Sequence, residues 1–512
     1  MDTGELFAYS WHVDDDEKMY TIIRIYGLNN KNETVCLVVK NFTPYVYLQL
    51  PDDIEWNEYK VKGLTDRINT IMEMPEGDFR PLKMQLMMKK RLYYAEMVNN
   101  ERKLFPYLCL TFQHSEHIEK FSRKFRYPMY ISGMGKVEFK VHEHNAGPIL
   151  QLTSLRKLPT AGWIKFTGRR IKPDEQHSSC PHEYVVKWKD LEPKVSDAVV
   201  RPYLMSFDIE VYSHRPSVMP DPGEDKDEIF QISCIFSRQG NKDYEKYLLT
   251  LGEPDEKGCG ENVKIRKFDL EYQLLDGFAN IIQEKQPNII MGYNIFGFDL
   301  PHMIARAEFI GSPEFRKQGF NRFGNSKERV IEWSSAAYKN QSFRFLDAEG
   351  RLLFDLLPQA KRLLKLSSYS LKAVSSHVLK NATKDPLDAK GIFKCYEIGI
   401  GQSKQRVIPT EKSRRALALV GKYCIQDSIL VTQLFETMTT WIALCEMSKV
   451  TGVPIFSLCT QGQQLKAFSQ VYRKCTHENI VVEKEGYKTK ENDHYVGATV
   501  FPPTPGIYEK VE

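Results

Sequence analysis

The chain has 512 residues, of which 42% are hydrophobic and 27% charged, so it is globular rather than disordered. That length exceeds one ordinary hydrophobic core and predicts about two to four domains of roughly 100–200 residues each. The net charge of +5 is compatible with nucleic acid but too small to argue for it alone.

Membrane and secreted classes are disfavoured by the sequence. We find no apolar run of about 18 residues and no charged-then-apolar amino terminus, which predicts a soluble, intracellular protein. The ten cysteines are scattered without a C-x-x-C pair, which argues against zinc ribbons and disulfide frameworks. One polar segment brings His177, Cys180 and His182 together in sequence. Structural zinc normally takes four protein ligands, so a plain loop is favoured there and metal binding is left open.

Residues 1–195 consist of short alternating segments, such as 19–28 and 32–50, separated by Asn, Gly and Pro. This pattern predicts a strand-rich, antiparallel amino-terminal domain. Two segments in it, 83–97 and 117–130, interleave Lys and Arg with Tyr and Phe. Such interleaving suits phosphate contacts combined with base stacking, and an amphipathic helix with solvated lysines explains it equally well.

From about 196 to 440, predicted strands alternate with predicted helices, which indicates a mixed α/β sheet flanked by helices. The expected strands are 203–212, 229–237 and 287–294, the expected helix is 271–285, and 219–228 is a polar loop. Beyond 440, a predicted helix at 462–475 and the Pro-rich segment 501–506 make 441–512 a helical and extended connector.

Asp208 and Glu210 flank an isoleucine in the predicted strand 203–212. Residues two apart in a strand share a face, so the two carboxylates project side by side and repel each other. A divalent cation between them would convert that repulsion into coordination. For a lone D-x-E, a solvated edge strand is the simpler interpretation, so other carboxylates must decide.

Two later segments supply further candidates. Asp299 ends a strand-to-helix turn in which it could simply cap the helix, but Asn294 and Phe298 in the same turn could hold a splayed base or its sugar. In the helical segment 416–438, Tyr423 and Asp427 are four apart and share a face. Four carboxylates on strand, turn and helix can hold two hard cations through oxygen ligands, and the Tyr423 phenol could bond the scissile phosphate or orient a water.

In this order, D-I-E, N-x-x-x-F-D and Y-x-x-x-D resemble the three exonuclease motifs of the family B DNA polymerases of eukaryotes and large DNA viruses. Segments 23–51, 366–379, 451–474 and 495–508 also resemble family segments in the same order, so the likeness covers essentially the whole chain. It implies an α/β and α+β multidomain fold, with the strand-rich domain at 1–195 and a ribonuclease-H-like 3′–5′ exonuclease domain at 196–440.

The resemblance also implies roles for particular residues. Asp208, Glu210, Asp299 and Asp427 would bind two Mg²⁺ or Mn²⁺ ions, with Tyr423 assisting. Asn294, Phe298, Ser370 and Leu371 would contact the frayed primer end, although a helix cap followed by a core leucine explains Ser370 and Leu371 equally well. Tyr495 and Gly497 lie in YVGA, which resembles the family's template-contacting Y-x-G-G/A motif; a turn at Gly497 is the alternative. For Asp355, a cap or salt bridge is favoured over a metal ligand.

One departure from the family matters. Neither the D-x-x-S-L-Y-P motif nor the D-T-D motif of the polymerase palm occurs in this sequence, so we expect no DNA synthesis by this chain alone. The expected activity is proofreading hydrolysis of DNA primer ends, in the nucleus or at a viral replication site. Expected partners are primer–template DNA, a chain carrying the palm and a processivity factor. The alternatives are a non-catalytic DNA-binding scaffold half and a free-standing exonuclease acting on RNA.

Overall fold

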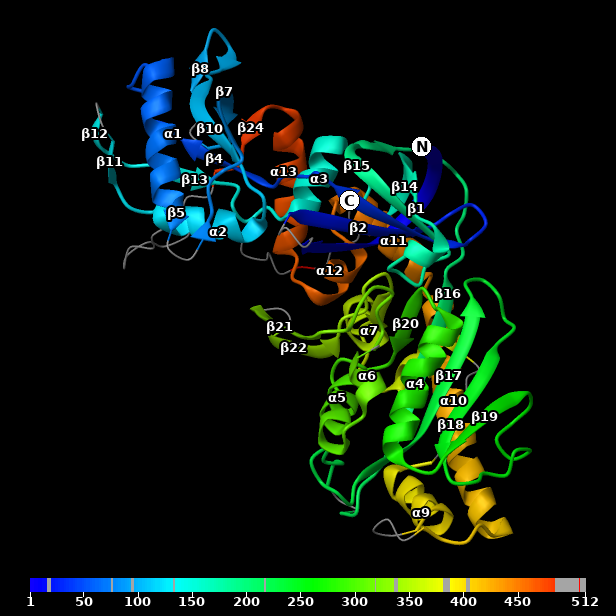
Figure 1. The fold of residues 1–512 in the computed structure, drawn as a ribbon. Helices are drawn as coiled ribbons and strands as arrows, with labels where there is room; N and C mark the ends of the chain where they lie inside the picture. The colour runs from blue at the N-terminus through cyan, green and yellow to red at the C-terminus, as the bar shows by residue number, and fades with distance from the viewer. Residues whose placement is uncertain are drawn as a thin grey trace.

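Two strand-rich units precede a mixed α/β unit along the chain (Figure 1). The structure, a computed structural model, describes residues 1–15, 20–74, 77–93, 96–131, 134–215, 218–317, 319–335, 339–380, 387–401, 406–483 and 506.

The first unit is a closed barrel with the strand order β1–β14–β15–β3–β2. Its strands are β1 (Asp2–Asp15), β2 (Thr21–Leu28), β3 (Thr34–Lys40), β14 (Gly162–Arg170) and β15 (His182–Pro193), and helix α3 (Pro148–Arg156) packs beside them. All pairings are antiparallel except that of β15 with β3. A Cβ at Gly27 would lie 2.4 Å from the Phe7 carbonyl oxygen, so the β1–β2 approach requires glycine there.

The second unit is a five-stranded sheet in the order β13–β4–β10–β7–β24. Its strands are β4 (Tyr45–Gln49), β7 (Lys83–Arg91), β10 (Phe105–Thr111), β13 (Lys140–His142) and β24 (Ile480–Val481). Helices α1 (Glu58–Met72) and α2 (Ser115–Lys124) cover one face through Leu64, Ile68 and Phe121. On the other face, tyrosines of β4 and β10 pack against Val481, and the hydroxyl of Tyr45 lies 2.9 Å from that of Tyr472. Residues from the far end of the chain therefore complete this sheet.

The basic and aromatic segments of this unit differ from each other. Residues 83–91 form strand β7, so the amphipathic-helix interpretation is wrong there. The Lys89 ammonium is buried 4.6 Å above the Tyr47 ring, and the Arg91 guanidinium lies 3.6 Å above Phe105. Residues 115–124, by contrast, form the amphipathic helix α2. Part of the positive charge thus pairs with aromatic rings inside the protein.

Glu143 joins the second sheet to the carboxyl-terminal segment, and it gives a testable pH dependence. Its buried Oε1 accepts the Val482 N–H at 2.9 Å, and burial raises its pKa to about 7 from an ordinary value of 4.5. The folded protein holds this proton to higher pH than the unfolded chain, so stability is full below about pH 4.5 and falls as pH rises to about 7.

We expect Glu143→Gln to remove this decline in the free energy of unfolding. For a pKa shift of this size the decline amounts to roughly 3 kcal/mol. The variant should resist denaturant better than the unsubstituted protein at pH 8 and about equally at pH 4.5. Denaturant midpoints at the two pH values measure the effect, and Glu138→Gln, at an exposed position, is the control. An unchanged pH profile in Glu143→Gln would contradict the assignment.

The third unit is a six-stranded sheet in the order β19–β18–β17–β16–β20–β23. Its strands are β16 (Tyr203–Tyr212), β17 (Glu228–Arg238), β18 (Glu245–Leu251), β19 (Val263–Phe268), β20 (Ile289–Gly292) and β23 (Leu352–Asp355). Only β17 runs against its neighbours; the other adjacent pairs are parallel. Helix α4 (Glu271–Lys285) covers one face and α10 (Glu411–Thr437) the other (Figure 1). The predicted multidomain fold with a mixed α/β sheet is confirmed.

Small polar side chains bring α10 close to the two central strands. The Ser206 hydroxyl donates to the Ser428 carbonyl at 2.7 Å, and the Ser233 hydroxyl donates to the Cys424 carbonyl at 2.9 Å. A Cβ at Gly421 would meet Leu248 at 2.5 Å. These contacts fix the middle of α10 over β16 and β17, which positions the α10 side chains discussed below.

The remaining elements surround this sheet. They are α5 (Asp299–Ile310), α6 (Pro313–Lys317), α7 (Leu356–Leu363), α8 (Leu371–Leu379), α9 (Ala389–Gly399), α11 (Thr440–Thr451), α12 (Ile455–Thr460), α13 (Gln464–His477) and the hairpin β21 (Glu328–Ser335) to β22 (Lys339–Leu346). Short two-stranded pairs are β5 (Glu73–Met74) with β6 (Gly77–Asp78), β8 (Met97–Val98) with β9 (Glu101–Arg102), and β11 (Met129–Ile131) with β12 (Gly135–Val137). Among the described residues no single helix is long and apolar enough to cross a membrane, although α10 and α11 pass that test as a pair bent by 50°.

Candidate active site

Asp208 and Glu210 lie on the central strand β16, Asp208 half-buried and Glu210 buried. One carboxylate oxygen of each and the Cys424 sulfur all lie within 4.8 Å of one another. In the part of the chain that the structure describes, no other set of three His, Cys, Asp or Glu side chains meets this spacing. The interpretation of this segment as a solvated edge strand is therefore wrong, because β16 is a central strand and these side chains face α10.

Asp299 approaches the same strand from its open edge. β20 pairs with β16 only from Leu204 to Ser206, and no strand in the described part of the chain pairs with that edge of β16 further along. The buried Asp299 carboxylate accepts the Ile209 N–H there, between the two acids of β16. Burial, with a smaller contribution from Asp355, raises the pKa of Asp299 to about 7. Asp299 is the first residue of α5.

Tyr423 and Asp427 reach the site from α10. Their side chains hydrogen-bond to each other, and Tyr423 is close enough to Asp427, Glu210 and Asp208 for all three to raise its pKa, after burial, which is the largest cause. The phenol therefore stays protonated at neutral pH and is a hydrogen-bond donor. Asp427 is buried. The structure thus brings Tyr423 close to Asp208 and Glu210, with Asp427 beside Tyr423 and Asp299 beside Ile209; neither Asp299 nor Asp427 belongs to the group that lies within 4.8 Å.

Cys424 is a neighbour that sequence reasoning missed, although it directly follows Tyr423. Its thiol donates to the Asp208 carbonyl at 3.5 Å. Burial, with Glu210 and Asp208 nearby, raises its pKa well above the ordinary value, so it is a neutral thiol at neutral pH. Because the thiolate is the form that binds metal, the usable donors here are carboxylate oxygens.

The turn that carries Asp299 is held by Asp355, whose carboxylate accepts the N–H groups of Asn294 at 2.8 Å and Phe296 at 3.1 Å. Asp355 also caps α7, as predicted. Asn294 has a left-handed backbone with φ of 66°, which asparagine tolerates. Asn294 and Phe298 are both half-buried, and the Phe298 ring lies 5.5 Å from that of His302.

Ser370 and Leu371 lie beside this turn. The Tyr293 hydroxyl donates to the Tyr369 carbonyl at 2.6 Å, which ties the turn to the start of α8. Ser370 caps α8 by accepting the Ala373 N–H, and Leu371 packs partly into a hydrophobic cluster. In the structure Ser370 is therefore a helix cap, and Leu371 is a partly buried core residue. Tyr495 and Gly497 lie outside the described residues.

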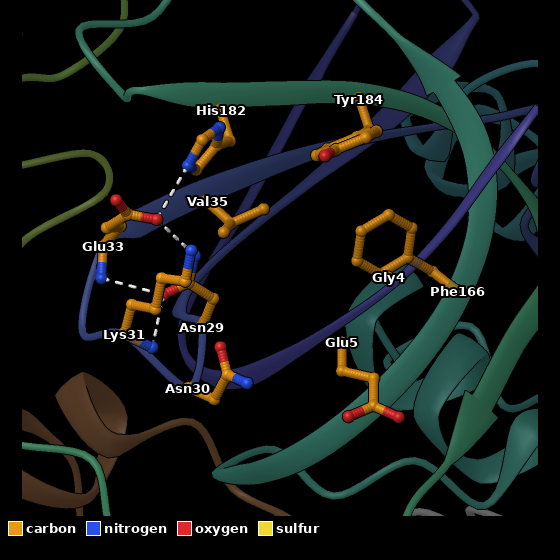
Figure 2. A pocket seen from close by; sticks show the side chains of 10 residues that line it. All are labelled: Gly4, Glu5, Asn29, Asn30, Lys31, Glu33, Val35, Phe166, His182 and Tyr184. Atoms are coloured by element: carbon orange, nitrogen blue, oxygen red, sulfur yellow. Dashed lines mark hydrogen bonds and ion pairs between the residues drawn. The ribbon is translucent and has the colours of Figure 1, made fainter.

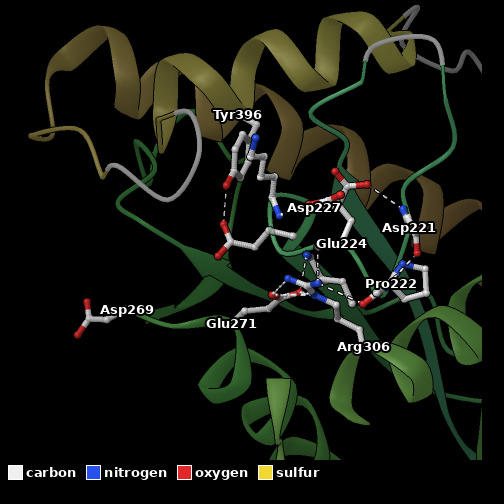
Figure 3. Close-up of polar contacts among 12 residues, drawn as sticks. Asp221, Pro222, Glu224, Asp227, Asp269, Glu271, Arg306 and Tyr396 are labelled. Carbon is white, nitrogen blue, oxygen red and sulfur yellow. Dashed lines mark hydrogen bonds and ion pairs between the residues drawn. The ribbon is translucent and has the colours of Figure 1, made fainter. Parts of the chain in front are cut away.

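A buried ion pair joins α5 to the start of α4, and the same arginine holds the loop that follows β16 (Figure 3). The fully buried Arg306 donates to both carboxylate oxygens of Glu271, with contacts of 2.7 and 2.8 Å, and to the carbonyls of Pro222 and Glu224. Asp227 closes the loop by accepting the Asp221 N–H at 2.8 Å. α5 begins at Asp299, so this network helps to set the position of that carboxylate.

The His177, Cys180 and His182 segment is not gathered around a common point. His182 Nε2 donates to Glu33 at 3.0 Å, as Figure 2 shows at one end of a barrel pocket, and its Nδ1 accepts from Arg170 at 2.9 Å. Cys180 is buried among barrel residues, and the His177 ring contacts Phe323. Both nitrogens of His182 are thus engaged in other bonds.

The donor set fits a hard divalent cation. Asp208 and Glu210 offer oxygens at coordinating separation, and Asp299 and Asp427 offer oxygens in contact with Ile209 and Tyr423. Oxygen ligands of this kind suit Mg²⁺ or Mn²⁺ rather than a thiolate-preferring metal.

Comparisons with known proteins indicate the family and the fold. The family model described as DNA polymerase family B, exonuclease domain, matches residues 139–374. DNA polymerase 120R of Invertebrate iridescent virus 3 is 40% identical over 531 residues, which cover 100% of this chain and 45% of that protein. The DNA polymerase delta catalytic subunit of Oryza sativa subsp. japonica is 29% identical, with coverages of 96% and 43%. The family B DNA polymerase of Pyrobaculum calidifontis superposes with a TM-score of 0.65 at 15% identity, covering 95% of this chain and 52% of that one.

The matched family and the mixed sheet define an exonuclease-type α/β domain, joined to a strand-rich amino-terminal part. The chain belongs to DNA polymerase family B and carries its amino-terminal and exonuclease part. It spans about half the length of the curated relatives that it matches. The matched range contains Asp208, Glu210 and Asp299 and ends before Tyr423 and Asp427.

Proposed function

We propose that this chain hydrolyses DNA from the 3′ end, one nucleotide at a time, as the proofreading part of a replicative DNA polymerase. The observation that carries the proposal is the convergence of Asp208 and Glu210 within 4.8 Å, with Asp299 bonded to the residue between them. Template-directed synthesis would require palm residues that this sequence lacks.

Each side chain has a defined task in this proposal. Asp208, Glu210, Asp299 and Asp427 would hold two Mg²⁺ or Mn²⁺ ions. Bound there, such ions lower the pKa of an attacking water and stabilise the leaving oxygen. Tyr423 keeps its proton and donates it in a hydrogen bond, either to Asp427 or to the water or phosphate that enters the site.

The frayed 3′ end would lie against the turn. Asn294 offers an amide and Phe298 a half-buried ring for the last sugar and base, and Ser370 and Leu371 stand next to that turn through the Tyr293–Tyr369 bond. Tyr495 and Gly497 remain predicted template contacts.

Metal dependence tests the proposal directly. A single-stranded DNA oligonucleotide labelled at its 3′ end should release labelled mononucleotide with Mg²⁺ or Mn²⁺ and none after chelation. Because an ion that binds only the folded chain stabilises it, adding Mg²⁺ should also raise Tm in a concentration-dependent way. Absence of both effects would refute the site assignment.

We expect Tyr423→Phe to slow nucleotide release by about 10- to 100-fold, the usual cost of losing a residue that orients a metal ligand or its water. The ring remains and only the hydroxyl is lost, so the Mg²⁺-dependent rise in Tm should persist. Tyr272→Phe, at an exposed position on α4, is the matched control. An unaltered rate in Tyr423→Phe would exclude a catalytic role for this hydroxyl.

A second candidate function is that of a non-catalytic DNA-binding scaffold that acts with a palm-carrying chain. It is favoured by the basic helix α2, on which Arg123 and Lys124 are exposed. Co-purification with such a chain, together with DNA binding but no hydrolysis, favours the scaffold. Hydrolysis of RNA faster than DNA of the same sequence would instead favour an RNA exonuclease, because the 2′-hydroxyl distinguishes the two substrates.

A further inference from the structure

A cavity of about 620 Å³ lies where three distant segments meet. Strand β1 contributes Trp11, the β21–β22 hairpin contributes Val330 and Phe345, and α12 with its end contributes Phe456 and Gln461. The volume lies within the range of sites for small organic ligands. It is separate from the carboxylate site, whose side chains do not line it.

The walls suit an aromatic ring that carries hydrogen-bond acceptors. Trp11, Phe345 and Phe456 supply aromatic surface, and the Trp11 indole is fixed by donating to the Thr160 carbonyl at 2.7 Å. The carboxylates of the wall are already paired, whereas the buried Arg351 donates through Nη2 to Gln286 at 2.9 Å and its Nε and Nη1 have no partner among the described residues. Asp347 accepts from the Lys327 N–H at 2.7 Å and from Arg329 at 3.3 Å.

Glu349, a buried residue of the cavity wall, also has partners. It accepts from the Tyr26 hydroxyl at 2.7 Å and pairs with Arg24 and His12. With the carboxylates paired and Arg351 offering N–H groups, the aromatic cavity favours a planar heterocycle that stacks and accepts a few hydrogen bonds.

The cavity also shares a wall with the candidate active site. The rings of Phe345 and Phe456 lie 5.3 Å apart, and both contact Phe296, at 5.4 and 6.5 Å. Phe296 belongs to the turn that carries Asn294 and Asp299, and its N–H donates to Asp355. An occupant stacked on Phe345 or Phe456 therefore lies one side chain away from that turn.

We propose that this cavity binds a single unpaired nucleobase, an inference that rests on the proposed function in that DNA is the substrate. The base comes either from a single strand or from a free nucleotide, which share the same ring chemistry. Val330, which is 55% exposed, and the exposed Gln461 stand at its rim, so larger side chains there block entry without disturbing the core.

The test uses the full chain carrying Asp208→Ala and Glu210→Ala, with chelator, so that binding is read without hydrolysis. The probe is 2-aminopurine deoxynucleoside monophosphate, whose fluorescence is quenched when it stacks on an aromatic ring. We expect saturable quenching that Val330→Trp and Gln461→Trp each weaken at least tenfold. Ser342→Trp, an exposed position on the same hairpin outside the cavity, should leave quenching unchanged. Competition by single-stranded DNA or by dAMP identifies the source of the base.

Absence of saturable quenching overturns the proposal, as does equal quenching in both rim variants or a loss in Ser342→Trp as large as theirs. Hydrolysis is measured separately on the unsubstituted chain. A chain that binds the probe but hydrolyses nothing refutes only the proposed function, and the converse refutes only the cavity. Thermal melting of each Trp variant confirms that it is folded.

Discussion

The double replacement Asp208→Ala, Glu210→Ala is expected to slow 3′-nucleotide release by at least about 10³-fold while leaving the protein folded. A divalent cation supplies several kcal/mol of transition-state stabilisation in such sites, and each 1.36 kcal/mol corresponds to a tenfold change in rate. Both carboxylates stand within coordinating distance of one another, so their removal eliminates the core of the donor set. Release of labelled mononucleotide from 3′-labelled DNA measures the loss.

The fold should tolerate this change. Two neighbouring anions repel each other without a cation, so removing them relieves repulsion on β16, and Tm without Mg²⁺ should stay equal or rise. The Mg²⁺-dependent rise in Tm should disappear. A matched control removes two carboxylates elsewhere, Glu284→Ala and Glu446→Ala, both more than half exposed on helices. Retained hydrolysis in the β16 variant, or equal loss in the control, would show that the carboxylates of β16 are not the catalytic donors.

Local patterns predicted the elements of the central sheet well. The helix at 271–285 is found at that position, and the strands at 203–212 and 229–237 are central strands. Their apolar runs are long and are bounded by turn residues, so local and tertiary preferences agree. In segment 83–91 the local pattern did not decide between a helix and a strand. It is a strand because β10 and β24 flank it, and β24 lies almost 400 residues further along the chain.

The spacing of the sequence motifs predicted which residues form the site, but it could not predict how the fold brings them together. The sequence order of Asp208, Asp299 and Tyr423 carried the hypothesis, whereas their proximity depends on features invisible in any motif. Asp299 lies next to Ile209 because β20 pairs with β16 only as far as Ser206. The orientation of Tyr423 depends on the serine hydrogen bonds that hold α10 against the sheet. The position of Cys424 beside the two carboxylates was not predicted, because a cysteine in a helix is usually a small buried core residue.

Arg306→Met is expected to destabilise the protein by about 3–5 kcal/mol, the usual cost of leaving one partner of a buried ion pair alone. Arg306 is fully buried, donates to both oxygens of Glu271 and also satisfies the carbonyls of Pro222 and Glu224 (Figure 3). Denaturant midpoints measure the loss. Arg415→Met, which breaks an exposed pair with Glu411, is the control and should change little.

The pH dependence of this variant separates an ion pair from simple packing. Burial already raises the pKa of Glu271, and Arg306 opposes that rise. Without Arg306 the pKa climbs further above its unfolded value, so the variant loses stability as pH rises above about 4.5. The deficit in stability should therefore be larger at pH 8 than at pH 5.

The double variant Arg306→Met with Glu271→Met should recover part of this deficit, because a buried pair can be replaced by apolar groups at little cost. A deficit independent of pH would mean that Arg306 acts through its volume alone. Since α5 begins at Asp299, nucleotide release should also fall in Arg306→Met under conditions where the variant is fully folded.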